Sequence, residues 1–394
     1  MGIKKKTLIL SSLTFYSVLG LALIPAQGQT SKAGSSSDIV SKEAPADETE
    51  LRAADYSNAK PLIRIVKTRS APAPATTVSE SGAPGFSPGR APTVAANTFK
   101  ALQLIPPKDL DRPSRAVEPS NFGTLNHPFT TARVATKSGS VNPATVFPYL
   151  PAGKLFFKIG ASTFVCSASV IRPRVVVTAA HCVSEFGTNR LYSNFEFFPG
   201  YTNGKAPVGK WTYKRVFVKK SYLNGTDTCL PGAEGVVCSN DVAVFVMNDK
   251  NGKKIGNVTG TFGYGFNGYG YTSFLKNRTS HITQLGYPVA LDNGGLMQRN
   301  DSLSYIDENL VKNQIIGSLM TGGSSGGPWL VNFGIAPSTT GIAAGNAPKP
   351  NLVVGVTSWG YRDSSLQEQG ASRFTDQNIV PLVKEACSAD PGNC

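Results

Sequence analysis

TGGSSGGP, at residues 321–328, is the most informative stretch of this 394-residue sequence. Its second serine, Ser325, is followed by two glycines. A serine in such surroundings can occupy a tight turn with an exposed hydroxyl, and the adjacent backbone N–H groups can converge on one negatively charged oxygen. Similar Gly/Ser stretches also form ordinary turns. The stretch therefore indicates a nucleophile only in combination with a base and a carboxylate.

The chain contains three histidines, and their surroundings differ. His127 lies in a low-complexity segment, and His281 lies in an expected strand, where a structural or surface role is the simpler interpretation. His181 follows the apolar run at residues 175–177 closely, so its imidazole would stand at the end of a strand. Histidine titrates in the range that suits general base catalysis. By elimination, His181 is the candidate base.

The candidate carboxylate is Asp241, which opens the apolar run at residues 242–245. A carboxylate that fixes the tautomer of a catalytic histidine is buried, and burial without a partner is costly. A solvated aspartate at a strand edge is the alternative interpretation. Ser325, His181 and Asp241 together are far more specific than any one of them.

From about residue 154 onward, short apolar or alternating runs are separated by Gly, Pro and Asn, a pattern that indicates a β-sandwich or a β-barrel. Near the C-terminus, apolar residues recur at helical spacing in residues 379–386, behind Asp376 as a candidate N-cap, which predicts one closing helix. Pro381 fits this helix only in its first turn. The expected strands are residues 155–157, 164–171, 174–178, 195–198, 211–218, 242–247, 315–320 and 352–359.

Together these motifs resemble the chymotrypsin-like serine proteases, and among them the extracellular bacterial branch that includes the glutamyl endopeptidases. The similarity covers about residues 150–388 and keeps the family's chain order of histidine, aspartate and serine. It is carried by TAAHC (178–182), DVAV (241–244), GYP (286–288), GSSGGP (323–328) and VTSWG (356–360). The resemblance implies an all-β fold of two six-stranded antiparallel β-barrels, with the catalytic triad in the cleft between them.

The resemblance also implies a role for each catalytic residue. Ser325 would attack a peptide carbonyl while His181 removes its proton, and Asp241 would orient the imidazole. The N–H groups of Gly323 and Ser325 would form the oxyanion hole. The resulting expectation is a serine endopeptidase that works through an acyl-enzyme intermediate.

The substrate-binding positions are expected in two places. The backbone of Ser358, Trp359 and Gly360 would pair with an extended substrate. Leu319 stands where the Arg/Lys-selective members of the family carry an aspartate, which disfavours a trypsin-like preference. Thr357 stands where glutamyl endopeptidases typically carry a histidine, which weakens an acidic preference. We expect a neutral or relaxed preference.

Ser324 marks a second departure from the family. Members that become active by inserting a newly freed N-terminal amine carry an aspartate at this position, immediately before the nucleophile. Activation through that ion pair is therefore not expected, and release from a pro-segment must work differently.

The chain contains six cysteines, and an even number favours disulfides in a chain with an export signal. Six cysteines allow 15 pairings, and their grouping favours three local ones. The resemblance supports the first of these, around the histidine. Zinc is the weaker alternative because no C-x-x-C pair occurs, so we expect neither a metal nor a cofactor. The expected pairs are Cys166 with Cys182, Cys229 with Cys238, and Cys387 with Cys394.

The N-terminus has the pattern of an export signal. Lysines at residues 4–6 precede an apolar run at residues 7–26, which small residues follow. We expect a signal peptide over residues 1–28 and a secreted or extracytoplasmic protein. An uncleaved anchor is the alternative, because a run of 20 residues at about 1.5 Å each would just span a bilayer.

Residues 29–142 are rich in Ser, Ala, Pro and Thr and poor in aromatic residues. Such a segment buries too little apolar area to offset about 1–2 kcal/mol of backbone entropy per residue. We expect it to be mostly disordered and to act as a linker or as a pro-segment. A cut after Arg133 would start the mature chain at Val134. The protease domain is expected over residues 143–394.

The net charge of +14 raises the question of anionic partners. Basic residues cluster at residues 210–220, but alternation along a strand places them on a solvated face. The expected partners are polypeptide substrates, with no nucleic acid, no stable membrane association after signal cleavage, and a monomeric state. The alternative function is that of a catalytically silent, secreted envelope-binding or adhesion protein on a protease fold.

Overall fold

The structure is a computed structural model. It forms two compact units, residues 1–35 and 36–394, and all described residues belong to the second. The expected signal peptide and His127 lie outside the described residues. The described residues are 38–62, 65–66, 82–95, 98–105, 128–135, 141–229, 238–274, 277–307, 313–334, 349–361 and 367–394.

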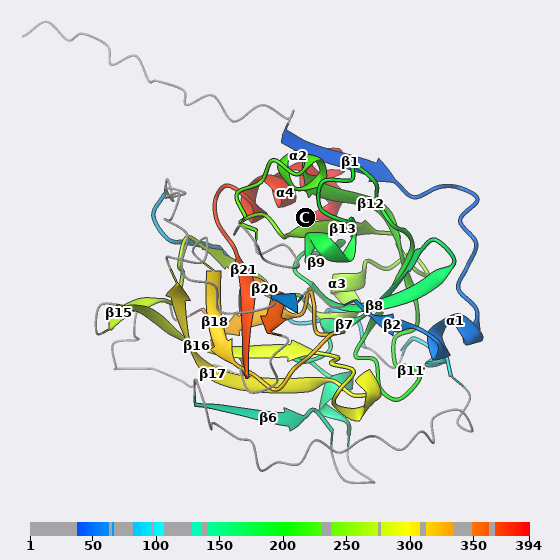
Figure 1. The fold of residues 1–394 in the computed structure, drawn as a ribbon. Helices are drawn as coiled ribbons and strands as arrows, with labels where there is room; N and C mark the ends of the chain where they lie inside the picture. The colour runs from blue at the N-terminus through cyan, green and yellow to red at the C-terminus, as the bar shows by residue number, and fades with distance from the viewer. Residues whose placement is uncertain are drawn as a thin grey trace, which may run out of the picture. The chain divides into compact units, whose positions relative to one another are not determined.

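The first barrel is a closed ring of six antiparallel strands (Figure 1). Along the ring, each strand is hydrogen-bonded to the next, and the pairing of β12 with β13 closes it. In ring order, the strands are β7 (Ala152–Ile159), β8 (Ser162–Val170), β9 (Val175–Thr178), β13 (Ala243–Met247), β12 (Trp211–Lys219) and β10 (Ser193–Pro199). Strand β9 reads Val-Val-Val-Thr and is buried throughout, because β-branched residues favour the extended backbone and the barrel interior takes their apolar side chains.

The second barrel is another closed ring of six antiparallel strands. The short β19 closes it by pairing with both β16 and β20. In ring order, the strands are β16 (Asn277–Gly286), β17 (Gln298–Asp307), β18 (Asn313–Gly317), β21 (Glu368–Arg373), β20 (Leu352–Tyr361) and β19 (Pro328–Val331). The predicted fold class of two six-stranded antiparallel barrels is thereby confirmed. The remaining short strands of this part of the chain are β11 (Lys205–Ala206), β14 (Gly263–Phe266) and β15 (Thr272–Phe274).

The closing helix α4 (Ile379–Ala389) is present, and it buries the expected apolar residues, Ile379, Leu382, Val383 and Ala386. Its N-cap is Asn378 instead of Asp376, because the Asn378 side chain accepts a hydrogen bond from the Ile379 N–H group. Pro381 therefore lies in the first turn, where its missing N–H group has no intrahelical partner to lose.

The other helical elements are single turns. They are α2 (Lys220–Asn224), α3 (Ile255–Thr259), η5 (Pro143–Thr145), η6 (Ala180–Cys182), η7 (Asp292–Gly294) and η8 (Pro391–Asn393). Within the described part of the chain, no helix has the length and apolarity needed to cross a membrane. The structure forms all three local disulfides expected from the sequence, Cys166–Cys182, Cys229–Cys238 and Cys387–Cys394.

The described parts of residues 29–142 pair with the barrels, so the expectation of disorder does not extend to them. The elements are β1 (Ile39–Glu43), α1 (Ala53–Ser57), β2 (Lys60–Pro61), β3 (Ile65–Val66), β4 (Gly85–Ser87), β5 (Leu102–Gln103) and β6 (Phe129–Arg133). Each of the six strands is added to a strand of the protease domain, for example β1 to β12 and β6 to β17. Strand edges supply backbone donors and acceptors to any extended chain, so a segment with few apolar residues can still bind there.

Candidate active site

Ser325 lies in the turn between β18 and β19, where both barrels contact the backbone. Its carbonyl accepts a hydrogen bond from the N–H group of Ser167 in the first barrel (2.7 Å), and the next residue, Gly326, donates to the carbonyl of Thr357 in the second (2.8 Å). Gly326 has φ +77°, and a Cβ atom there would lie 2.1 Å from the Thr178 hydroxyl oxygen. Only glycine fits this close approach of the serine turn to the strand that precedes His181.

The backbone before Ser325 is held in a conformation that leaves two N–H groups without an acceptor among the described residues. The Ser167 hydroxyl donates to the Gly323 carbonyl (2.9 Å) and accepts from the Tyr287 N–H group (3.0 Å). Gly323 has φ +97°. Among the residues described, the N–H groups of Gly323 and Ser325 donate to no carbonyl or side chain. Two such donors in one turn can hold an oxyanion.

His181 and Asp241 form a buried pair. His181 lies in η6, directly after β9, and its Nδ1 atom is 2.8 Å from Asp241 Oδ2. The backbone N–H group of His181 donates to Asp241 Oδ1 (2.7 Å), and the Ser358 hydroxyl donates to Oδ2. The side chains of His181 and Asp241 are each 1% exposed. Asp241 therefore fixes Nδ1 as the protonated nitrogen and leaves Nε2 as the one that can accept a proton.

The pKa of Asp241 reflects two opposing effects. Burial raises it, but the charge of His181 and the hydrogen bonds from His181 and Ser358 outweigh burial and hold the pKa below its usual value. The carboxylate thus stays ionised inside the protein, as the orienting role requires.

The Ser325 hydroxyl and His181 Nε2 do not form a hydrogen bond with each other in this structure. Among the described residues, His181 Nε2 has no hydrogen-bond partner. The Ser325 hydroxyl faces the carbonyl oxygen of Leu62, 3.5 Å away. The structure thus brings His181 and Asp241 into contact and packs the serine turn beside them, while an N-terminal residue occupies the space in front of the serine.

The five expected substrate-binding residues have separate environments. Leu319, after β18, is half-buried, and Thr357 is buried in β20. Ser358 uses its hydroxyl to hold Asp241. Trp359 is buried, and its ring lies so close to Gly370 that a Cβ atom there would be 2.0 Å away. Gly360 pairs with Gln369 of β21 and with Ile65 of the N-terminal segment.

The hydroxyl of Thr357 is part of a buried amide network that the sequence did not reveal. It accepts hydrogen bonds from Gln284 Nε2 and Trp329 Nε1, both at 2.9 Å. Gln284 Nε2 also donates to Gln369 Oε1 (2.6 Å), and the Ser318 hydroxyl donates to Gln284 Oε1 (2.9 Å). In the sequence, only the glutamines Gln284 and Gln369 point to this network, and glutamines are too common to single out.

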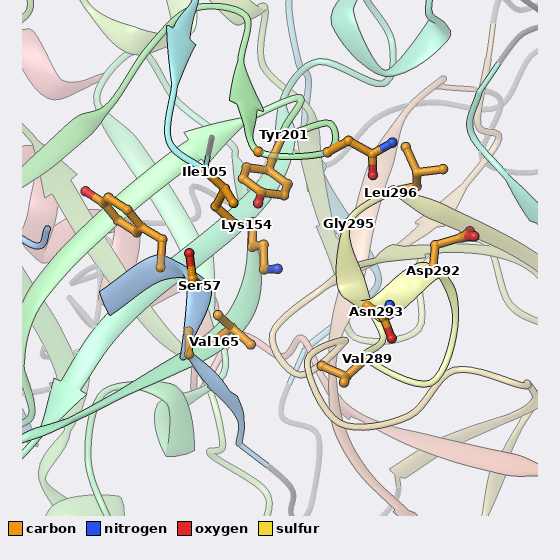
Figure 2. A pocket seen from close by; sticks show the side chains of 14 residues that line it. Ser57, Ile105, Lys154, Val165, Tyr201, Val289, Asp292, Asn293, Gly295 and Leu296 are labelled. Atoms are coloured by element: carbon orange, nitrogen blue, oxygen red, sulfur yellow. The ribbon is translucent and has the colours of Figure 1, made fainter. Parts of the chain in front are cut away.

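A cavity of about 400 Å³ lies between Val165 of β8 and Val289 (Figure 2). It is lined by Val165, by Val289, whose N–H group donates to the Gly322 carbonyl (2.9 Å), and by Ser57 of α1. Lys154 points into it in Figure 2 and is otherwise buried, with its ammonium group donating to the Gly294 carbonyl (2.8 Å). Burial lowers the pKa of Lys154 to about 7.

Replacing Lys154 with methionine is expected to raise the melting temperature most below about pH 7. The pKa of Lys154 falls from 10.5 to about 7 on folding, so unfolding takes up a proton between these values. The destabilisation caused by the buried charge is complete below pH 7 and fades toward pH 10.5. Thermal unfolding at about pH 6 and about pH 9, with the exposed Lys253→Met variant as control, measures the difference. An equal gain at both pH values would contradict the prediction.

The chain is similar in sequence to known proteins. The family model described as Trypsin matches residues 139–378. A glutamyl endopeptidase from Bacillus licheniformis is 25% identical over 148 residues, which are 38% of this chain and 39% of that protein. The match thus spans well under half of the relative's length.

Two solved structures are similar over most of their own length. Protease Anisep from Arthrobacter nicotinovorans is 28% identical, with a TM-score of 0.45, over 62% of this chain and 95% of that one. The thermostable serine protease AL20 from an extremophilic microorganism is 23% identical, with a TM-score of 0.47, over 61% of this chain and 97% of that one. Because the Trypsin family model covers more than half of the sequence, including His181, Asp241 and Ser325, the chain belongs to the trypsin family.

Proposed function

We propose that this protein is a secreted serine endopeptidase that hydrolyses peptide bonds through Ser325, His181 and Asp241. The observation that carries the proposal is the buried His181–Asp241 pair next to a serine turn with two N–H groups that donate to no described residue. Membership of the trypsin family supports a serine peptidase. The endopeptidase activity and the roles of the three residues are proposed from the geometry of the site.

The reaction follows from these positions. The Ser325 hydroxyl oxygen attacks the peptide carbonyl carbon, and its proton passes to His181 Nε2, the nitrogen that Asp241 leaves free to accept. Asp241 stabilises the imidazolium so formed. The N–H groups of Gly323 and Ser325 bind the oxyanion, an effect of about 10²- to 10³-fold in rate for one donor in comparable sites.

Collapse of this intermediate breaks the bond to the peptide nitrogen. His181 returns the proton to that nitrogen, the amine leaves, and the acyl group stays on Ser325. Water then attacks the ester, again losing a proton to His181, and the acid product leaves with Ser325 restored. The cycle consumes one peptide and one water, and it needs neither a metal nor a cofactor.

The substrate would bind as an added strand along β20, at Gly360, and the part that follows the cleaved bond would lie beside β8. We propose a neutral or relaxed side-chain preference. The hydroxyl of Thr357, at the position where a charged partner would be needed for acidic side chains, is engaged by the neutral amide of Gln284.

The proposed setting is extracellular. The three disulfides are suited to an oxidising compartment. We propose that residues 1–28 direct export, that the segment before the protease domain is a pro-segment, and that the active protein is a monomer acting on polypeptides without nucleic-acid or stable membrane partners.

A fluorophosphonate probe tests the proposal, because it reacts with an activated serine. The purified full chain is labelled before and after limited digestion with a metalloprotease, which a chelator then stops, and N-terminal sequencing identifies the product. We expect labelling of the digested chain and of its Ser324→Ala variant, and none of Ser325→Ala. Absence of labelling in both forms of the parent chain would overturn the proposal in favour of a catalytically silent protein, and labelling of Ser325→Ala would overturn the assignment of the nucleophile.

A further inference from the structure

One N-terminal stretch passes across the candidate active site. On the side of the first barrel, β2 pairs with β8, Pro61 opposite Val165, and the Leu62 N–H group donates to the Val165 carbonyl (3.3 Å). The carbonyl oxygen of Leu62 then faces the Ser325 hydroxyl at 3.5 Å. On the side of the second barrel, β3 pairs with β20, Ile65 opposite Gly360. The N-terminal segment therefore pairs with both walls of the site, with β8 through β2 and with β20 through β3.

The direction of this stretch is the informative feature. Both pairings, β2 with β8 and β3 with β20, are parallel. Within both barrels every ring pairing is antiparallel. A chain that ran the opposite way, from β20 toward β8, would be antiparallel to both walls.

A productive substrate must run that opposite way. His181 Nε2 has to reach the leaving nitrogen, and the disulfide Cys166–Cys182 ties the His181 turn to β8. The half of the substrate after the cut bond therefore continues along β8, and the half before it lies along β20. The N-terminal stretch enters at β8 and leaves at β20, so its peptide bonds have the reverse polarity.

We propose that the N-terminal segment described by residues 38–62 and 65–66 is an intramolecular inhibitor that occupies the substrate site in the reverse direction; this inference rests on the proposed function. After Leu62 the described chain resumes at Ile65, which pairs with Gly360 of β20. If Ser325 attacked the Leu62 carbonyl, the leaving amine would therefore belong to the β20 side of the site, whereas the His181 turn is tied to β8. The amine could not be protonated, and the adduct would revert to the peptide. The segment thus fills the site, and keeps Ser325 from His181, without being cut as a substrate.

Tyr56 anchors this inhibitor on the first barrel. Its hydroxyl donates to Glu196 Oε2 (2.5 Å), and its ring meets Phe156 and Phe198 edge-on at 5.1 and 5.7 Å. The N–H group of Leu51 donates to Glu196 Oε1 (3.3 Å). Tyr56 and Glu196 are both buried, although they come from segments 140 residues apart. A buried carboxylate that accepts the hydroxyl, together with two aromatic rings that contact the tyrosine ring, is a built receptor for one tyrosine.

Strand β1 adds a second attachment. Residues 39–43 pair with Lys219 to Arg215 of β12 in an unbroken register. Lys210 forms an ion pair with Glu50 (2.9 Å) as well as with Glu196 (3.3 Å). Because the inhibitor is part of the same chain, its effective concentration is on the order of millimolar, so modest contacts keep the site closed.

Weakening the anchor tests the proposal in the full chain. Tyr56→Ala is expected to raise hydrolysis of a small chromogenic peptide by the undigested protein on the order of tenfold or more, because each tenfold corresponds to about 1.4 kcal/mol of lost contacts. Tyr56→Phe, which keeps the ring, is expected to give a smaller increase. Lys253→Ala, an exposed change outside the N-terminal segment, serves as the control and is expected to leave the rate unchanged. The proposal would be overturned if undigested Tyr56→Ala protein hydrolysed the peptide no faster than the undigested parent, although the same variant became fully active after digestion.

A synthetic peptide of residues 50–66 tests the direction of binding. Added to the digested enzyme, it is expected to inhibit competitively and to remain uncut between residues 60 and 66. Two results would refute the inhibitor while leaving the endopeptidase proposal intact. One is hydrolysis within that stretch at the rate of an ordinary substrate, and the other is equal probe labelling of the undigested and the digested parent chain. Absence of labelling in both forms would instead refute the endopeptidase.

Discussion

Ser325→Ala is expected to lower kcat for peptide hydrolysis by about 10⁵- to 10⁶-fold in the digested protein, the loss seen when the nucleophile of a comparable triad is removed. No other hydroxyl in the described turn is placed to replace it. The neighbouring Ser324 hydroxyl donates to the Thr321 carbonyl (2.7 Å) and accepts from Gln369 Nε2 (3.3 Å). Initial rates on a casein-type substrate and on a chromogenic peptide measure the effect.

Ser324→Ala is the matched control for this variant. It removes the same hydroxyl one residue earlier, from a side chain that is fully buried. The resulting loss of stability is expected to be on the order of 1 kcal/mol, without loss of the nucleophile. A similar loss of activity in the two variants, with both proteins folded, would show that the turn and not the Ser325 hydroxyl is what the reaction needs.

Asp241→Asn is expected to lower kcat by about 10⁴-fold, with little change in KM. An asparagine amide at this position would donate to Nδ1 and stabilise the tautomer whose Nε2 carries the proton, which cannot act as a base. The hydroxyl of Ser358 and the backbone N–H group of His181 also donate to this carboxylate, so its replacement disturbs the orientation of the imidazole too. Steady-state kinetics over a range of substrate concentrations separate kcat from KM.

Asp227→Asn provides the matched control for the carboxylate. Asp227 is half-buried, and desolvation raises its pKa to about 6, but it accepts its hydrogen bonds from Asn240 and Thr228. This variant is expected to keep most of the activity. Activity of Asp241→Asn within about tenfold of the parent would contradict the assigned role, because a tautomer-fixing carboxylate has a far larger effect.

Much of the candidate site could be predicted from short stretches of sequence because its residues are positioned by local structure. His181 follows β9 directly, so a run of β-branched residues before it already places the imidazole at a strand end. The three disulfides close loops with sequence separations of 16, 9 and 7 residues, which proximity along the chain favours. The glycines on either side of the serines indicate a tight turn, because they tolerate positive φ.

Other parts of the site depend on contacts between residues that are far apart in the sequence. The Ser358 hydroxyl reaches Asp241 across 117 residues, and Gln284 reaches Gln369 across 85. A serine in a Ser-Trp-Gly motif suggests only backbone pairing, and a glutamine in a strand suggests no partner at all. Such side-chain contacts follow from how the two barrels close, which local patterns do not encode.

The sequence by itself determined the candidate triad residues, their order, a β-sandwich or β-barrel and the local disulfides, because each rests on local periodicity, turn chemistry or loop length. The choice of two six-stranded barrels came from the family resemblance. Only the tertiary structure decided where residues 38–62 and 65–66 bind. Their composition predicts little burial, yet strand edges accept any extended backbone, and one tyrosine meets a carboxylate and two rings that the folded barrel assembles. The direction of such a segment in the site depends on whether its strands pair in parallel or antiparallel. Because the backbone groups that form these hydrogen bonds are the same in nearly all residues, the sequence does not reveal the direction.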